Sequence, residues 1–135
     1  MPHTTTTNSA YIPGVCNINR LEIARRRKAG YGGLMIALVY LGACLTLTNM
    51  IWWRLLLIAP AFVAIIGFLQ AKNAFCVGYG SAGKQNAEAD SQQAHTVTNE
   101  TALCKDRAKA RAMNLQALAG AALISLLCLL LPSTA

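Results

Sequence analysis

Two long apolar segments joined by a single charged residue constrain this chain more than any other feature. They run from Gly33 to Ala71, and the charge between them is Arg54. Each segment is long enough to cross the hydrocarbon core of a bilayer, which takes about 20 residues of helix. We therefore expect a transmembrane helical hairpin with spans at about 33–53 and 55–77.

The turn of the hairpin carries residues that suit a membrane–water interface. Trp52 and Trp53 directly precede Arg54. Amphipathic aromatic rings gather at the level of the lipid headgroups, and a long basic side chain can extend to the same level. We expect Arg54 to reach the headgroups in this way.

A third apolar segment lies near the end of the chain. A helical pattern starts at Thr101, which we expect to be the N-cap, and an uncharged stretch follows at about 113–131. Asp106 and Lys109 stand at i,i+3 spacing, which predicts an ion pair on the helix surface. Small residues that allow a close approach between helices recur every four positions, at Ala117, Ala121 and Ser125.

The segment before the first span is polar and basic. Residues 1–16 are expected to form a disordered tail, and residues 17–32 a basic interfacial helix followed by a glycine joint. Asn19 and Glu22 have the spacing of a helix N-terminal capping box. The basic run is expected to contact anionic lipid headgroups; alternatively, it is a solvated charge run that only fixes topology. It consists of Arg25, Arg26, Arg27 and Lys28.

These patterns predict an all-α membrane protein. Three transmembrane helices, within residues 33–131, follow a short amphipathic basic interfacial helix. Residues 78–100 between the second and third spans are small and polar, and we expect an exposed, partly disordered cytoplasmic loop, with residues 78–112 on the cytoplasmic side.

Charge excludes some classes of protein and orients the predicted spans. The chain of 135 residues is 55% hydrophobic and 13% charged, too apolar for a basic nucleic-acid-binding domain despite a net charge of +7. Five of the twelve Lys and Arg residues precede the first span, six lie between the second and third, and Arg54 stands alone on the opposite side. The positive-inside rule then places the N-terminus and the long loop in the cytoplasm and the C-terminus outside.

Two short motifs match known binding loops in amino-acid sequence alone. Residues 77–80 read VGYG, as in a potassium-channel filter, but they follow a full-length span and precede a polar stretch. Residues 78–84 approach a phosphate-binding loop, yet Gln85 replaces the required Ser or Thr, and no strand precedes them. Both matches are better explained as a glycine-rich exit from the second span.

The cysteines offer one route to chemistry. Cys16 and Cys76 both fall near the predicted cytoplasmic surface and are weak candidates for a redox pair or a metal site. Cys104 and His95 could complete a tetrahedral site with them. The competing explanation is that these cysteines are small buried hydrophobic residues.

The chain resembles a family of small, uncharacterised bacterial integral membrane proteins. The resemblance covers most of the chain from Tyr11 to the third span, and rests on YIPGVCNI, EIARRRKAG, WWRLLL, FLQAKNAFC and DRAKA, in this order. It implies a bacterial inner-membrane protein with Cys16, Glu22 and Cys76 as motif positions. The family supplies no activity.

The sequence favours a non-enzymatic membrane protein with an interaction or structural role. Its expected partners are anionic lipids and either a second copy of the chain or another membrane protein, but not nucleic acid. No catalytic constellation and no cofactor is predicted. The alternatives are a thiol-redox or metal-binding protein that uses Cys16 and Cys76, and, third, an ion-channel subunit.

Overall fold

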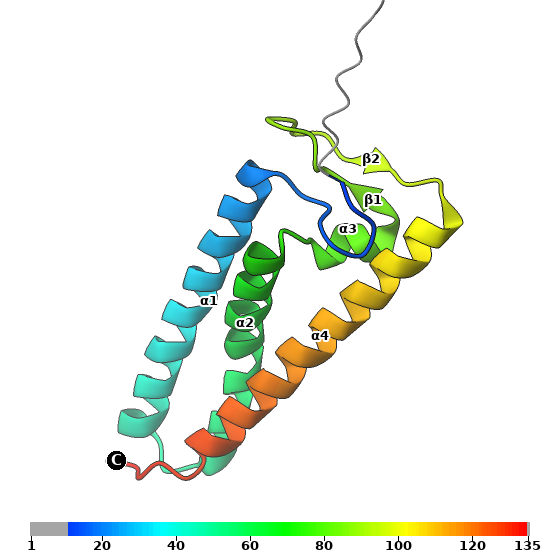
Figure 1. Ribbon diagram of the computed structural model, residues 1–135. Helices are drawn as coiled ribbons and strands as arrows, with labels where there is room; N and C mark the ends of the chain where they lie inside the picture. The colour runs from blue at the N-terminus through cyan, green and yellow to red at the C-terminus, as the bar shows by residue number, and fades with distance from the viewer. Residues whose placement is uncertain (1–10, 135) are drawn as a thin grey trace, which may run out of the picture.

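The computed structural model describes residues 11–134, which are mostly helical (Figure 1). Three of its helical segments are long and apolar enough to cross a membrane. The elements in chain order are α1 (Arg20–Leu47), the 3₁₀ helix η1 (Ile51–Leu57), α2 (Ile58–Asn73), α3 (Val77–Ala82), β1 (Lys84–Gln85), β2 (His95–Thr96) and α4 (Glu100–Cys128).

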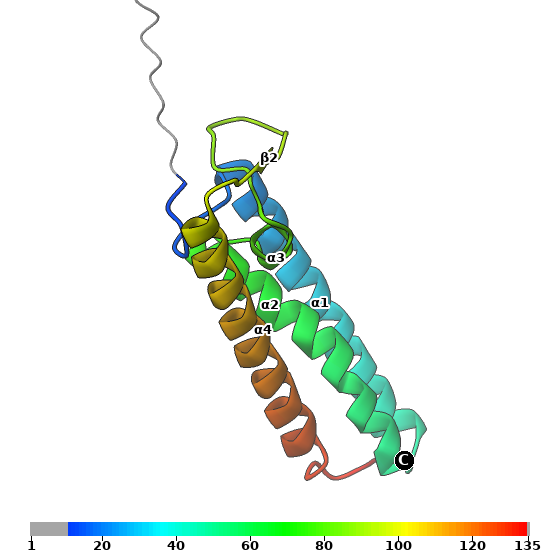
Figure 2. The same ribbon diagram turned by 90° about the vertical axis from the view of Figure 1, so that its right-hand side faces the viewer.

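The bundle has two distinct ends, and both views place α2 between α1 and α4 (Figures 1 and 2). We call the end formed by residues 11–19 and 74–99 the capped end, because these segments cover the helices there. The opposite end, called the turn end, holds η1 and residues 129–134.

The first helix is longer than the sequence pattern predicts. It starts after Asn19, whose side-chain oxygen accepts a hydrogen bond from the Glu22 amide at 3.1 Å, so the predicted N-cap is confirmed. The helix then continues without a break to Leu47. The expected separate interfacial helix and glycine joint are therefore not seen, and the basic run forms the first turns of α1.

Gly30 and Gly33 of α1 allow close packing against α2. A Cβ atom added at Gly33 would lie 2.6 Å from the backbone nitrogen of Ala64, and one added at Gly67 would lie 2.6 Å from that of Gly30. The backbones of α1 and α2 approach each other too closely for any side chain at these positions. Such contact between small residues is a common way to join helices in a membrane, and it offsets the low helix propensity of glycine.

The turn end corrects the prediction for Arg54. The α1 helix ends at Leu47, several residues earlier than expected, and Arg54 lies in η1 with only 5% of its surface exposed. Its guanidinium donates hydrogen bonds to the carbonyl oxygens of Cys128 at 3.2 Å and Leu131 at 2.5 Å. A cation at the C-terminus of α4 satisfies carbonyls that lack helical partners and complements the helix dipole. Arg54 therefore binds inside the protein instead of extending to the headgroups.

The last helix packs through one narrow face. Its N-cap is Asn99 rather than the expected Thr101. The predicted small-residue stripe is confirmed as buried, and it extends in both directions beyond the expected three residues. The buried positions of α4 are Ala102, Asp106, Ala110, Met113, Ala117, Ala121, Ser125 and Cys128.

Residues 78–100 are more structured than an exposed loop. The second span ends at Asn73, where Ala74 adopts a left-handed conformation (φ 50°) and reverses the chain. The segment then forms α3 and a two-stranded antiparallel sheet, in which Lys84 pairs with Thr96. Phe75 and Val77 pack with α4 in a small core. These contacts fix the capped end.

Candidate functional site

The N-terminal segment from Tyr11 to Asn19 is anchored on α4 through a buried carboxylate. Asp106 is fully buried and accepts hydrogen bonds from the Tyr11 hydroxyl and the Gly14 amide, both at 2.7 Å. Burial, together with the hydrogen bond to Asp106 and its negative charge, raises the pKa of Tyr11 well above its usual value of 10.0. Residues 11–16, assigned to the disordered tail, are therefore packed, whereas residues 1–10 lie outside the described part of the chain.

Asp106 does not form the ion pair that its spacing predicts. Its carboxylate faces the N-terminal segment. Lys109 instead donates a hydrogen bond to the side-chain oxygen of Asn73 at 3.1 Å. The helix turns these two side chains toward different neighbours, because Asp106 lies on the buried face of α4.

Asn17 connects the N-terminal segment to the joint between α2 and α3. It is fully buried, and its side chain accepts a hydrogen bond from the Cys76 amide at 2.6 Å and donates one to the Cys76 carbonyl at 3.1 Å. Its backbone nitrogen donates to the Ala74 carbonyl at 3.0 Å, and its backbone oxygen accepts from Asn86 at 2.7 Å. One asparagine thus satisfies backbone groups of two segments that are far apart in sequence.

Asn19 extends this connection to the polar stretch before β2. While its oxygen caps α1, its amide nitrogen donates to the carbonyl oxygens of Glu88 and Ser91, both at 2.8 Å. Asn86 is fully buried, donates to the Ser91 carbonyl at 3.2 Å and bridges to Ile18. The asparagines of the CNIN sequence therefore hold the capped end together.

The predicted headgroup-binding run divides into two pairs. Glu22 is buried and forms ion pairs with Arg25 at 2.6 Å and Arg26 at 3.3 Å. Arg27 and Lys28 are exposed and extend from the other sides of α1. Arg26 is therefore committed to an internal pair, while contact of Arg25, Arg27 and Lys28 with headgroups stays a prediction.

The candidate thiols lie in adjoining segments of the capped end. Cys16 directly precedes Asn17, which holds the backbone of Cys76. Cys16 is half-buried and Cys76 is buried, and no disulfide joins cysteines within residues 11–134. Asn17 brings the two segments together, and a functional pair of Cys16 and Cys76 stays a prediction.

The larger metal site that the sequence left open is not assembled. Within the described residues, no three His, Cys, Asp or Glu side chains group so as to hold a metal ion. Cys104 is exposed on α4, while His95 pairs with Glu88 at 3.4 Å. The fold therefore places Cys104 and His95 apart from any such cluster.

The two short binding-loop motifs have structural roles. Residues 77–80 form the first turn of α3, so they do not adopt the extended backbone of a filter. A Cβ atom at Gly80 would lie 2.6 Å from the Phe75 ring, so this glycine permits packing. Gly83 ends α3 with φ +72°, and the strand β1 follows it. A phosphate-binding loop needs the reverse order, strand before helix.

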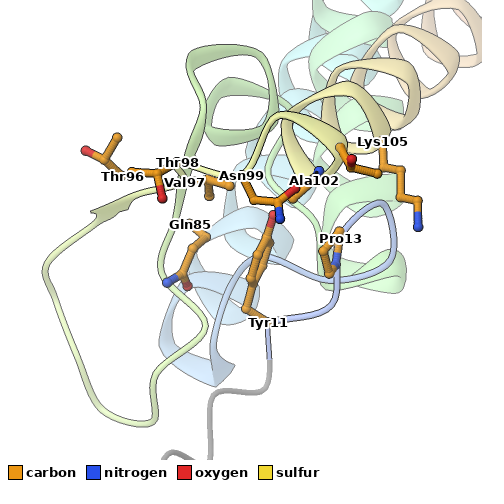
Figure 3. Close-up of a pocket in the computed structure, with 10 residues that line it drawn as sticks. Tyr11, Pro13, Gln85, Thr96, Val97, Thr98, Asn99, Ala102 and Lys105 are labelled. Carbon is orange, nitrogen blue, oxygen red and sulfur yellow. Dashed lines mark hydrogen bonds between the residues drawn. The ribbon is translucent and has the colours of Figure 1, made fainter.

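The capped end also has an open cavity of about 630 Å³ with a mixed polar and apolar lining (Figure 3). Tyr11 and Pro13 form one wall and Gln85 another, and the start of α4 contributes Asn99 and Lys105. The Tyr11 hydroxyl is already engaged by Asp106. Lys105 supplies the only formal charge among the described residues of the lining.

Comparisons of the chain with protein-family models, with curated proteins and with solved structures give no match. Its function is therefore argued from geometry and chemistry.

Sequence reasoning missed the residues that hold the capped end together. Asp106 gave a signal that the predicted surface ion pair overlooked, because it falls on the same helical stripe as Ala110 and Ala117. Asn17 and Asn86 gave none, because neither belongs to a sequence pattern that indicates burial and only the tertiary fold brings them together.

Proposed function

We propose that this chain is a non-enzymatic integral membrane protein of the bacterial inner membrane, with an interaction or structural role. It acts as an oligomer or with a membrane-protein partner, and in contact with anionic lipids. The N-terminus and the capped end face the cytoplasm, and the C-terminus lies outside.

One observation carries the proposal: the long helices present far more apolar surface than they bury. Only 17% of the most apolar window of α1 and 22% of that of α4 are buried inside the protein. Large side chains such as Met35, Val39 and Leu115 are more than half exposed. Such a surface marks contact with lipid or with other helices. A structural or interaction role uses this surface directly.

The basic residues support the orientation. Arg25, Arg27 and Lys28 on α1 are exposed toward the capped end, as are Arg107 and Arg111 on α4. The turn end has Arg54, whose charge is buried against α4. Loops rich in Lys and Arg stay on the cytoplasmic side of inner-membrane proteins. The bacterial inner membrane is the setting that the sequence resemblance implies.

The polar motif residues support a structural role for the capped end. Distant segments of the chain are joined by side-chain hydrogen bonds of Asp106, Asn17 and Asn19. Glu22 is neutralised by two arginines of its own helix. These groups build a rigid platform over the helices, which suits a binding surface of fixed shape.

The oligomeric state tests the proposal. The purified full-length chain is placed in lipid nanodiscs and its mass measured by light scattering, alongside chemical cross-linking in the native membrane. We expect a defined oligomer or a reproducible cross-link to another membrane protein. A monomer without any cross-linked neighbour would contradict the interaction role. A reporter fused to the C-terminus that proves cytoplasmic would overturn the orientation.

A thiol-redox or two-thiol metal protein is the second candidate, favoured by the bonds of Asn17 that bring the Cys16 segment to Cys76. Thiol titration and metal analysis of the purified protein separate it from the first. A Cys16→Ser variant with altered reactivity at Cys76, or metal bound in proportion to protein, would favour it. Absence of metal with unaltered Cys76 reactivity would favour the structural role. The third candidate, a channel subunit, has no supporting observation, because residues 77–80 are helical.

A further inference from the structure

An apolar groove runs along the bundle between α1 and α4, with α2 as its floor. It encloses about 220 Å³ and is lined by Leu34 and Leu38 from α1, Ala61 and Phe68 from α2, and Ile124 from α4. Both views show α2 between the two outer helices (Figures 1 and 2). Leu34, Leu38 and Ile124 are partly exposed, so the groove opens onto the outer surface of the apolar helices.

Two of the three helices continue the groove face toward the capped end with a basic residue. Residues one or two turns apart share a helix face. Arg27 therefore lies above the first groove leucine of α1, and Lys72 lies one turn beyond Phe68 on α2. We call Arg27 and Lys72 the mouth cations.

The mouth cations are not neutralised within the described residues. Among residues 11–134, the ion pairs are those of Glu22 with Arg25 and Arg26, and of Glu88 with His95. Arg27 and Lys72 are exposed. An apolar groove thus ends at two unpaired positive charges contributed by two different helices.

We propose that this groove binds one anionic phospholipid, with an acyl chain along the apolar lining and the phosphate between the mouth cations. From Phe68 to Leu57 the floor rises by about 16 Å at 1.5 Å per residue, close to the depth of one leaflet in a hydrocarbon core of about 30 Å. The volume lies below that of pockets for compact ligands, about 300–1,000 Å³, and suits part of a chain. The proposal rests on the proposed function, because it requires the helices to lie in a membrane.

The experiment measures lipid retained by the full-length protein. The chain is reconstituted in vesicles of phosphatidylcholine and phosphatidylglycerol in equal amounts, extracted in mild detergent, and its bound lipids are counted by native mass spectrometry. One variant replaces both mouth cations by Gln. A matched control removes the same charge from exposed positions on α4, with Arg107→Gln and Arg111→Gln. A third variant replaces Ala37, another lining residue on α1, by Leu and so fills the groove without changing any charge.

We expect the wild type and the control to retain phosphatidylglycerol in preference to phosphatidylcholine. Each cation near an anionic phosphate contributes about five-fold in affinity, so loss of both lowers retention about 25-fold. Ala37→Leu is expected to lower retention through steric exclusion of the acyl chain. Circular dichroism checks folding; if the double variant does not fold, Lys72→Gln alone is expected to lose about five-fold.

Three results would overturn the site. Equal loss in the control variant would show a diffuse charge effect. Unchanged retention in Ala37→Leu would show that no chain occupies the groove, and dissociation of an oligomer by the same substitution would assign the groove to a second copy of the chain. Failure of the site and of the proposed function are distinguishable. A membrane-embedded oligomer without lipid preference refutes only the site, whereas recovery of the chain without membranes refutes both.

Discussion

Replacing Asn17 by Ala is expected to loosen the joint between α2 and α3. The Asn17 side chain makes two hydrogen bonds to the backbone of Cys76, and it is fully buried. The Cys76 carbonyl keeps a second donor, the Gly80 amide at 2.9 Å. The Cys76 amide loses the partner that it has at 2.6 Å. The two ends of the side chain therefore contribute unequally.

The magnitude follows from this asymmetry. A buried donor left without a partner costs about 1–3 kcal/mol, and a hydrogen bond whose acceptor remains satisfied contributes about 1 kcal/mol. We expect a loss of about 2–4 kcal/mol in the free energy of local opening. At about 1.4 kcal/mol per factor of ten, this accelerates amide exchange at the joint by about thirty- to a thousand-fold.

Hydrogen–deuterium exchange of the reconstituted protein measures this effect directly, with peptides that cover residues 74–80. Asn114→Ala is the matched control, because Asn114 is exposed on α4, and a change within about 0.5 kcal/mol is expected there. If Asn17→Ala left exchange at residues 74–80 at the wild-type rate, the assignment of Asn17 as the connector of the capped end would be refuted.

Three further substitutions test separate contacts. Tyr11→Phe is expected to lower the free energy of unfolding by about 1–2 kcal/mol below pH 10. Because the pKa of Tyr11 is raised in the folded protein, the difference in stability from wild type should shrink as the pH rises above 10.0. A stability difference that does not depend on pH would contradict the contact with Asp106. Gly67→Ala places a Cβ atom 2.6 Å from the backbone of Gly30 and should lower the melting temperature, with overpacking costing about 1–3 kcal/mol; Gly42→Ala, with open space around it, should be neutral or stabilising. Arg54→Gln should increase exchange at the C-terminal turn of α4 while leaving its first turns unchanged, since the guanidinium contacts only the last carbonyls; uniform exchange along α4 would refute this role.

The hairpin was predictable because its signal is local. A continuous apolar stretch interrupted by Arg54 predicts two helices without any knowledge of tertiary contacts. Together with the third apolar segment, these give the three helices in the structure that are long and apolar enough to span a membrane. The N-cap at Asn19 was predictable for the same reason, since cap and helix are adjacent in sequence. The predictions of helix ends were less accurate, since α1 ends at Leu47, earlier than the sequence pattern predicts.

The roles of individual polar residues depended on distant partners. Arg54 was expected to reach the headgroups because its sequence neighbours are aromatic, but the C-terminus of α4 lies within its reach only in the folded bundle. The glycines after the basic run suggested a flexible joint, whereas Gly33 is required by the approach of α2. Asp106 was paired with Lys109 by spacing, yet its partners come from the N-terminal segment.

The cytoplasmic orientation of the capped end is central to the proposed function, and Cys104 tests it most directly. This thiol is exposed on α4 near the capped end, while Cys44, Cys76 and Cys128 are buried. A membrane-impermeant maleimide is applied to intact bacterial cells and to inside-out membrane vesicles, with Cys104→Ser as the control for labelling at other thiols. We predict modification of Cys104 only in the inside-out vesicles. Modification in intact cells, with none in the vesicles, would contradict the orientation and with it the proposed cytoplasmic platform.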